Sequence, residues 1–218
     1  MNIVCVTGTD TDVGKTWVTA ALGAALVARG KSVVAIKPVE SGLGGGDLGD
    51  GAVLAAATGQ EAPTQALTRL CAPLAPPVAS EREEVRLDTA MWISEIRRYS
   101  RGADVTLVEG AGGLLSPLTW SSTFRDLALV LKARTLVVGL DRLGTLNHTL
   151  MTLELLNRSG VVPIGVVLNT VNSDSSTGSN AASLQRVQPF LGVATVPRVR
   201  SWQRAVPAME PVVDWVLR

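Results

Sequence analysis

Short segments of β-branched residues alternate along this chain with longer segments rich in Ala and Leu. That alternation is typical of βαβ units, in which helices cover a buried parallel sheet. Strands are predicted at residues 3–7, 32–36, 105–108, 136–139, 164–168 and 193–196. Helices are predicted at residues 14–29, 50–58, 124–132, 182–190 and 208–217.

Cap and turn residues indicate where other elements end. Gly30 suits the end of the first helix, and Asp88 suits the start of a helix that ends near Ser100. Thr145 is expected to cap a helix that ends before Gly160. Four prolines, at 63, 73, 76 and 77, predict that residues 60–87 are irregular. We therefore predict an α/β fold with a single doubly wound, mostly parallel sheet flanked by helices, as one domain over residues 1–218.

Composition narrows the classes of function. The 218 residues are 46% apolar and 18% charged, with a net charge of +1, which favours neither a nucleic-acid groove nor a membrane surface. Two Cys and one His cannot form a Cys/His zinc site, and no Gly-x-Ser-x-Gly motif supports a hydrolase. The chain has no signal-peptide pattern and no apolar span of membrane length. We expect a cytoplasmic protein with small-molecule ligands and no nucleic-acid or membrane partner.

The first predicted strand leads directly into a glycine-containing loop, Gly8-Thr9-Asp10-Thr11-Asp12-Val13-Gly14-Lys15-Thr16, and a helix follows. In this order, loop N–H groups and the helix N-terminus can surround phosphate oxygens. Lys15 would bring its charge to the β- and γ-phosphates, and the Thr16 hydroxyl would reach Mg²⁺. The strict motif has glycine at the position of Thr9, whereas this chain has Gly8 one place earlier.

Two further segments place charged residues after predicted strands. Glu109 follows the strand at 105–108 and precedes Gly110-Ala111-Gly112-Gly113, so a carboxylate at the strand tip has room for a ligand beside it. In phosphate-loop proteins such an acid holds the metal. Lys37 follows the strand at 32–36, near the same sheet edge as Lys15. Asp47 and Asp50, in the glycine-rich segment after it, are candidates for a second metal carboxylate.

These segments together resemble the dethiobiotin synthetase family, and the resemblance covers most of the chain. It rests on Gly8–Thr16, Lys37-Pro38-Val39-Glu40-Ser41-Gly42, Val108–Gly113 and Leu143-Gly144-Thr145-Leu146-Asn147-His148. The family also lacks the first glycine of the strict motif, so Thr9 supports the resemblance. The implied fold is of the P-loop NTPase type.

The resemblance implies an ATP-dependent cyclo-ligase of biotin biosynthesis. Such an enzyme joins 7,8-diaminononanoate (7,8-diaminopelargonate) and carbon dioxide into dethiobiotin, with release of ADP and phosphate. One amine captures carbon dioxide as a carbamate, ATP phosphorylates the carbamate, and the second amine displaces phosphate. Phosphorylating a carbamate brings two anions together, so cations are needed where charge develops.

The resemblance also assigns residues. The catalytic set is Lys15, Lys37, Thr11 and Ser41. The metal ligands are Thr16, Asp50 and Glu109, with Asp50 matching the family's spacing better than Asp47. The nucleotide-binding set is Asp12, Val13, Gly14, Lys15, Thr16, Trp17, Glu109, Gly110, Ala111, Gly112, Gly113, Asn169 and Pro197. Asp12 is expected to act only through its charge, and Asn169 and Pro197 are expected on the side of the adenine base.

The diamine is expected to contact Thr11, Lys37 and Ser41, together with a segment from elsewhere in the chain. That segment, Gly144-Thr145-Leu146-Asn147, opens a predicted helix, and a helix N-terminus suits a carboxylate. In the family it reaches across a homodimer interface to the substrate's carboxylate. The resemblance therefore implies a homodimer with active sites at the interface.

An alternative hypothesis is a P-loop nucleotide switch of the partitioning or division-site type. Those ATPases usually carry a lysine early in the phosphate loop, where this chain has Asp10 and Thr11. The synthetase part of a cobyrinate-type amidotransferase would need an added glutaminase domain, for which 218 residues leave no room.

Overall fold

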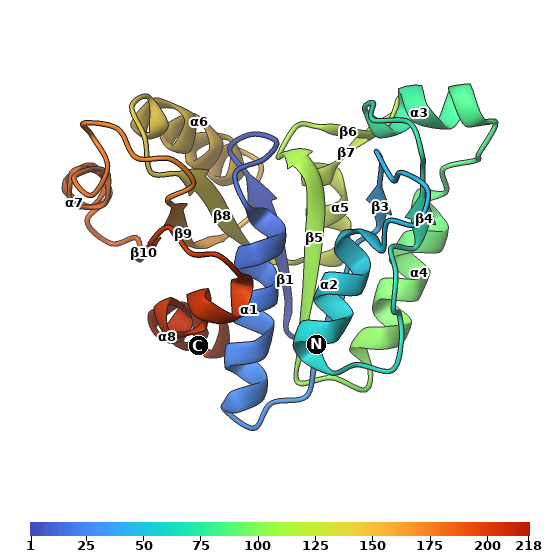
Figure 1. Cartoon of the computed structure of the whole chain (residues 1–218), viewed down its shortest axis with the longest axis horizontal. Coiled ribbons are helices and arrows are strands. Elements are labelled where there is room, and N and C mark those ends of the chain that lie inside the picture. The colour runs from blue at the N-terminus through green and yellow to red at the C-terminus, as the bar shows by residue number, and fades with distance from the viewer.

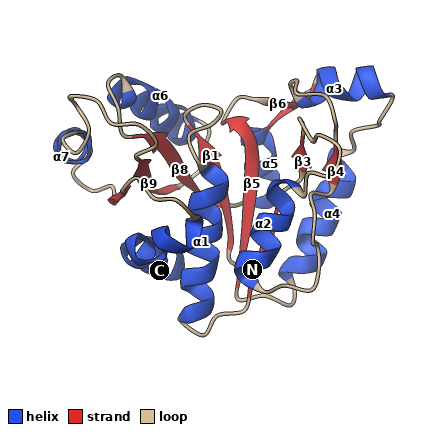
Figure 2. Ribbon diagram, in the orientation of Figure 1, coloured by secondary structure: helices blue, strands red, loops and turns tan.

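The computed structural model describes residues 1–218 and is built on one six-stranded sheet. The strand order is β10-β9-β8-β1-β5-β2, and every neighbouring pair is parallel. The strands are β1 (Ile3–Gly8), β2 (Val33–Ile36), β5 (Val105–Gly113), β8 (Arg134–Leu140), β9 (Pro163–Asn169) and β10 (Val193–Val196). Their carboxyl ends meet at the upper edge of the sheet, where loops gather (Figure 2). The predicted α/β class is confirmed.

Helices cover both faces of this sheet, because successive side chains of a strand point to opposite sides. Val4 and Val6 of β1 join one apolar cluster, and Ile3 and Cys5 join the other. The first cluster is covered by α1 (Lys15–Ala28), α2 (Gly49–Thr58), the 3-10 helix η1 (Trp202–Met209) and α8 (Glu210–Leu217). The second is covered by α4 (Thr89–Ser100), α5 (Phe124–Leu131), α6 (Thr145–Arg158) and α7 (Asn180–Val187). In Figure 1, α1 and α2 lie in front of the sheet and α5 and α6 behind it.

Residues 60–87, predicted to be irregular, contain two regular elements. The strand β4 (Thr68–Arg69) pairs in parallel with β3 (Val39–Glu40), and α3 spans Pro76–Glu83. The prediction was wrong for α3 because Pro76 and Pro77 occupy the first helical positions, where no N–H partner is needed. A short antiparallel pair, β6 (Pro117–Thr119) and β7 (Ser122–Thr123), follows β5.

Several predicted boundaries are confirmed and others are wrong. Asp88 caps α4 by accepting a hydrogen bond from the Met91 N–H at 2.9 Å, and Gly30 ends α1 with a φ of 74°. The N-cap of α6 is Gly144, so Thr145 is the first helical residue instead of the cap. The segment at 208–217 is divided between the end of η1 and α8. None of the helices has the length and apolar character needed to cross a bilayer.

The Trp215 ring packs against two glycines, Gly165 in β9 and Gly192 directly before β10. A Cβ added at Gly165 would overlap the ring carbons of Trp215, as would one at Gly192. Overpacking of this kind costs about 1–3 kcal/mol, so Gly165→Ala should lower the unfolding free energy by that amount in urea denaturation. Gly102→Ala is the control, because a Cβ there meets nothing within 4 Å. Equal stability of the two variants would contradict this packing.

Candidate active site

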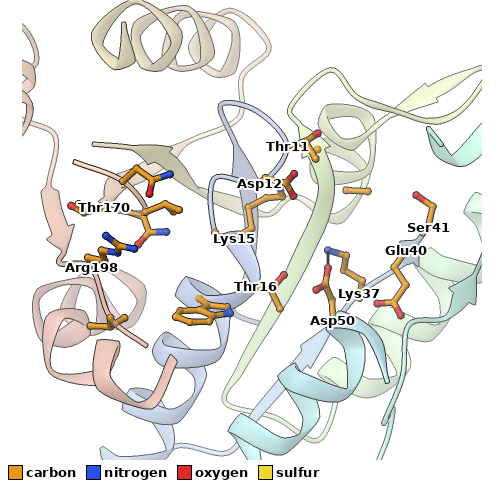
Figure 3. A pocket seen from close by; sticks show the side chains of 18 residues that line it. Thr11, Asp12, Lys15, Thr16, Lys37, Glu40, Ser41, Asp50, Thr170 and Arg198 are labelled. Atoms are coloured by element: carbon orange, nitrogen blue, oxygen red, sulfur yellow. Dashed lines mark hydrogen bonds and ion pairs between the residues drawn. The ribbon is translucent and has the colours of Figure 1, made fainter. Parts of the chain in front are cut away.

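A cavity of about 600 Å³ opens at the carboxyl ends of β1, β2, β5 and β9. Its wall brings together residues that are far apart in sequence, and Figure 3 shows their side chains converging from several elements. The lining residues are Thr11, Asp12, Gly14, Lys15, Thr16, Trp17, Lys37, Glu40, Ser41, Asp50, Ala111, Gly112, Asn169, Thr170, Val171, Asn172, Arg198 and Val199.

The loop between β1 and α1 has a backbone shape that few residues adopt. Asp12 and Gly14 both have positive φ, at 56° and 87°. A Cβ at Gly14 would overlap the Asn169 amide, and that amide donates a hydrogen bond to the Val13 carbonyl at 3.0 Å. No side chain caps the N-terminus of α1. Its first N–H groups are therefore free to bind an anion.

Lys15 is buried within this loop. Its ammonium donates a hydrogen bond to the Asp10 carbonyl at 3.0 Å, so the side chain folds back over the loop that precedes it. Burial and the nearby Lys37 ammonium lower the pKa of Lys15 below its usual value, although three carboxylates oppose the shift. A negatively charged ligand in the cavity would relieve this repulsion.

Lys37 joins two carboxylates at the base of the cavity. Its Nζ lies 2.6 Å from Glu109 Oε1 and 2.7 Å from Asp50 Oδ2 (Figure 3 shows the Asp50 pair). The Thr16 hydroxyl donates to the same Glu109 oxygen at 2.8 Å. Burial disfavours the charge of Lys37, but the two carboxylates outweigh it and raise the pKa of Lys37 above its usual range. Burial likewise opposes ionisation of Asp50, and Lys37 more than compensates, so the pKa of Asp50 is lowered.

Glu109 lies inside a strand instead of at its tip, because β5 continues to Gly113. The register of β1 against β5 shifts between Val6 and Gly8, and Gly8 pairs with Gly113. Gly110 contacts the Phe124 ring so closely that a Cβ would lie 2.9 Å from it. The predicted end of this strand at residue 108 was therefore wrong. The glycines continue the strand, and because they have no side chains they leave space above it.

Most of the predicted site residues line the cavity, but several lie outside its wall. Glu109 is fully buried and reaches the cavity through Lys37 and Thr16, while Val13 contributes a carbonyl to Asn169. Neither Pro197 nor Asp47 lines the cavity, and the Asp47 carboxylate accepts a hydrogen bond from the Gly49 N–H at 3.1 Å. The residues outside the wall are Val13, Glu109, Gly110, Gly113, Pro197 and the α6 segment Gly144, Thr145, Leu146 and Asn147.

Six lining residues were not predicted: Glu40, Thr170, Val171, Asn172, Arg198 and Val199. Arg198 and Val199 directly follow the predicted Pro197, and Thr170 directly follows Asn169. Glu40 lies in the motif that supplied Lys37 and Ser41. Adjacency to a predicted residue was the available signal for Glu40, Thr170 and Arg198. In Figure 3, Arg198 and Thr170 lie across the cavity from Lys37 and Asp50.

The donor atoms beside Lys37 suit a hard cation. Glu109 Oε2 is buried without a hydrogen-bond partner, and the Thr16 hydroxyl and the Asp50 carboxylate lie on the same side of the cavity. Oxygen ligands of this kind are those that Mg²⁺ prefers. No group of three or more His, Cys, Asp or Glu side chains gathers to hold a metal ion. A cation here would therefore also need ligands from a nucleotide and water.

Comparison with known proteins decides the family. Residues 2–205 match the model of a family described as an AAA domain. A relative from Anaeromyxobacter sp. (strain Fw109-5), named ATP-dependent dethiobiotin synthetase BioD, is 40% identical over 206 residues, or 91% of this chain and 92% of that protein. The chain belongs to the dethiobiotin synthetase family. A relative of the same name from Rhodococcus erythropolis (strain PR4) is 42% identical over 175 residues, or 78% of this chain and 76% of that protein.

Solved structures share the fold of this dethiobiotin synthetase family member at low identity. The septum site-determining protein MinD from Pyrococcus horikoshii, complexed with Mg-ADP, has a TM-score of 0.59 and 17% identity, covering 99% of this chain and 93% of that chain. A ParA family ATPase from Chlorobium tepidum has a TM-score of 0.59 and 14% identity, covering 100% of this chain and 98% of that chain. These likenesses confirm the P-loop NTPase fold. The sequence relatives favour the synthetase over the nucleotide switch.

Replacing Lys37 with Met should remove the cation that Glu109 faces while keeping an aliphatic stem. Breaking a buried ion pair at one partner costs about 3–5 kcal/mol, so Lys37→Met should lower the unfolding free energy by that amount. The double variant Lys37→Met with Glu109→Gln should recover most of the loss. Arg158→Met is the control, because it removes only an exposed pair with Glu154. Urea denaturation tests this, and equal stability of Lys37→Met and Arg158→Met would contradict it.

Proposed function

We propose that this chain is an ATP- and Mg²⁺-dependent dethiobiotin synthetase that closes 7,8-diaminononanoate and carbon dioxide into a cyclic urea. The observation that carries the proposal is the convergence of Lys15 and Lys37 on one cavity. Lys15 belongs to the loop that suits phosphate, and Lys37 lies beside the Asp50 and Glu109 carboxylates. We assign the substrates because the chain belongs to the dethiobiotin synthetase family.

The reaction explains why the cavity holds two lysines. One amine attacks carbon dioxide and loses a proton, which gives a carbamate. A carbamate oxygen then attacks the γ-phosphorus of ATP, and ADP leaves. The second amine attacks the carbonyl carbon, the bond to the phosphate oxygen breaks, and the nitrogen gives up its proton. The phosphorylation step joins two anions, so we assign Lys15 and Lys37 to offset the charge that develops there.

Thr16, Asp50 and Glu109 are the residues that would hold Mg²⁺. When bound, the ion supplies positive charge to the phosphate oxygens of the nucleotide. The Oε2 atom of Glu109 has no hydrogen-bond partner and is assigned to the ion, while Oε1 accepts hydrogen bonds from both Lys37 and Thr16. Lys37 therefore places a buried positive charge next to the proposed metal ligands.

The nucleotide base is assigned to the wall formed by Trp17, Asn169 and Arg198. The Trp17 side chain is 40% exposed and lines the cavity one position after Thr16. The Asn169 amide nitrogen donates one hydrogen bond to Val13, and we assign its carbonyl oxygen to the base. That arrangement suits the exocyclic amine of adenine. Val13, Gly110, Gly113 and Pro197 lie outside the cavity wall, and we assign them to its support.

The diamine is assigned to the opposite side, beside Thr11, Ser41, Ala111 and Gly112. The α6 segment Gly144–Asn147 lies outside the wall of this cavity. Its exposed flank carries Leu143, which is 78% exposed, and Met151, which is 58% exposed and one helical turn beyond Asn147. We infer a homodimer in which Gly144–Asn147 of one protomer reaches the diamine's carboxylate in its partner.

The first experiment measures phosphate release with ATP, Mg²⁺ and bicarbonate. Release should depend on added 7,8-diaminononanoate, with dethiobiotin detected by mass spectrometry. Lys15→Gln should reduce the rate about 100-fold or more, because charge stabilisation at the phosphate is lost. Lys132→Gln, an exposed lysine at the end of α5, should leave it unchanged. ATP hydrolysis at the same rate with and without the diamine would contradict the proposal and favour the nucleotide switch.

Light scattering at micromolar concentration tests the dimer. The wild type should have the mass of two chains, and Met151→Glu should shift it towards one chain and reduce dethiobiotin formation. Phe190→Glu is the control, because it changes another fully exposed apolar residue outside α6, in the segment between α7 and β10. A wild-type monomer with full activity would refute the shared site.

A further inference from the structure

Glu40 is a buried carboxylate in the cavity wall that the proposed reaction does not use. It is 4% exposed, and its Oε1 atom has no hydrogen-bond partner. Glu40 and Ser41 are consecutive on an extended segment, and their side chains point in opposite directions (Figure 3). Ser41 donates to the Leu74 carbonyl, whereas Glu40 faces α2. Burying a carboxylate is costly, so its contacts identify what it holds in place.

Glu40 caps the first turn of α2 from a distant strand. Its Oε2 accepts a hydrogen bond from the Gly51 N–H at 3.0 Å, and Leu48, the N-cap residue, supplies no side-chain bond. The first N–H groups of a helix lack partners within the helix, and a negative charge is favourable at this end. Glu40 therefore supplies from β3 what the helix's own sequence does not.

Two glycines let the helix approach Glu40 closely. Gly49 has a φ of 76°, and a Cβ there would overlap Glu40 Oε1. A Cβ at Gly51 would overlap the backbone of Gln65 and Ala66. A larger residue at position 49 would push the helix end away from Glu40, and one at position 51 would push it away from residues 65–66.

Arg69 lies beside both Glu40 and the segment that precedes α2. Its Nε lies 3.7 Å from Glu40 Oε1, and a terminal nitrogen donates to the Asp47 carbonyl at 2.8 Å. Glu40 and Arg69 are register partners in the β3–β4 pair. The guanidinium thus ties Glu40 to the segment that enters α2.

Asp50 is the residue whose place depends on this arrangement. It lies between Gly49 and Gly51, and its carboxylate is 43% exposed, in contrast to the fully buried Glu109. Packing alone therefore holds Asp50 less firmly than Glu109. We propose that Glu40, supported by Arg69, is a positioning residue that fixes the first turn of α2 so that Asp50 reaches Lys37 and the Mg²⁺ site. This rests on the cation site of the proposed function.

The test measures ADP affinity by calorimetry, with Mg²⁺ and with EDTA, and so needs neither the diamine nor turnover. Loss of a residue that orients a metal ligand typically costs 10–100-fold in metal affinity. Glu40→Ala should weaken ADP binding about tenfold or more in Mg²⁺ and leave it nearly unchanged in EDTA. Glu40→Gln should recover most of the loss, because its amide oxygen still accepts the Gly51 bond. If Glu40→Ala does not fold, Glu40→Asp, too short to reach Gly51, replaces it.

Glu83→Ala is the matched control for a purely structural role. The Glu83 carboxylate accepts hydrogen bonds from the Cys71 and Ala72 N–H groups, at 3.0 and 2.7 Å, in the segment that follows β4. Its loss should lower the melting temperature with no Mg²⁺-specific effect on ADP.

Two results would overturn the inference alone: an equal effect of Glu40→Ala in Mg²⁺ and in EDTA, or no effect in either. The same Mg²⁺-specific loss in Glu83→Ala would also overturn it. A wild-type chain that binds ADP equally well with and without Mg²⁺ would overturn the proposed cation site and this inference with it.

Discussion

The ion pair between Lys37 and Glu109 is the constraint around which the site is built. Both side chains are withdrawn from water, so each requires the other's charge. Because β5 lies between β1 and β2, the pair joins adjacent parallel strands, while Thr16 and Asp50 attach α1 and α2 to it. Four elements therefore share one charge centre. A shift of β2 against β5 would leave a buried charge without its partner.

The strand–loop–helix unit that contains Gly14 and the helix ends at Asp88 and Gly30 could be predicted because their signals are local. Gly14 and Lys15 belong to one strand–loop–helix unit, and the roles of Asp88 and Gly30 depend on the few residues beside them. The β3–β4 pair could not be predicted, because a strand of two residues has no recognisable periodicity. The two strands are also far apart in the sequence. The strand at 105–108 was predicted to end before the glycines of β5, and the low strand propensity of glycine favours that boundary. Pairing with β1 outweighs that preference.

The sequence predicted which segments form the candidate site better than it predicted how their side chains are oriented. Motifs placed Thr11, Lys37, Asp50 and Ala111 around one cavity, since parallel strands end at the same sheet edge. They did not indicate that the Asn169 amide turns towards Val13, because side-chain orientation depends on packing across the sheet. Arg198 was missed for a similar reason: nothing in a loop's composition shows which of its residues faces inward.

The hydrogen bond from Lys15 to the Asp10 carbonyl has a consequence for nucleotide exchange. With this bond the ammonium occupies a defined position before any phosphate arrives, and the positive φ values of Asp12 and Gly14 are already in place. Under the proposed function, an arriving phosphate would replace the carbonyl as the acceptor, and little ordering of the chain would have to accompany binding. The carbonyl would then be the partner to which the lysine returns when the product departs.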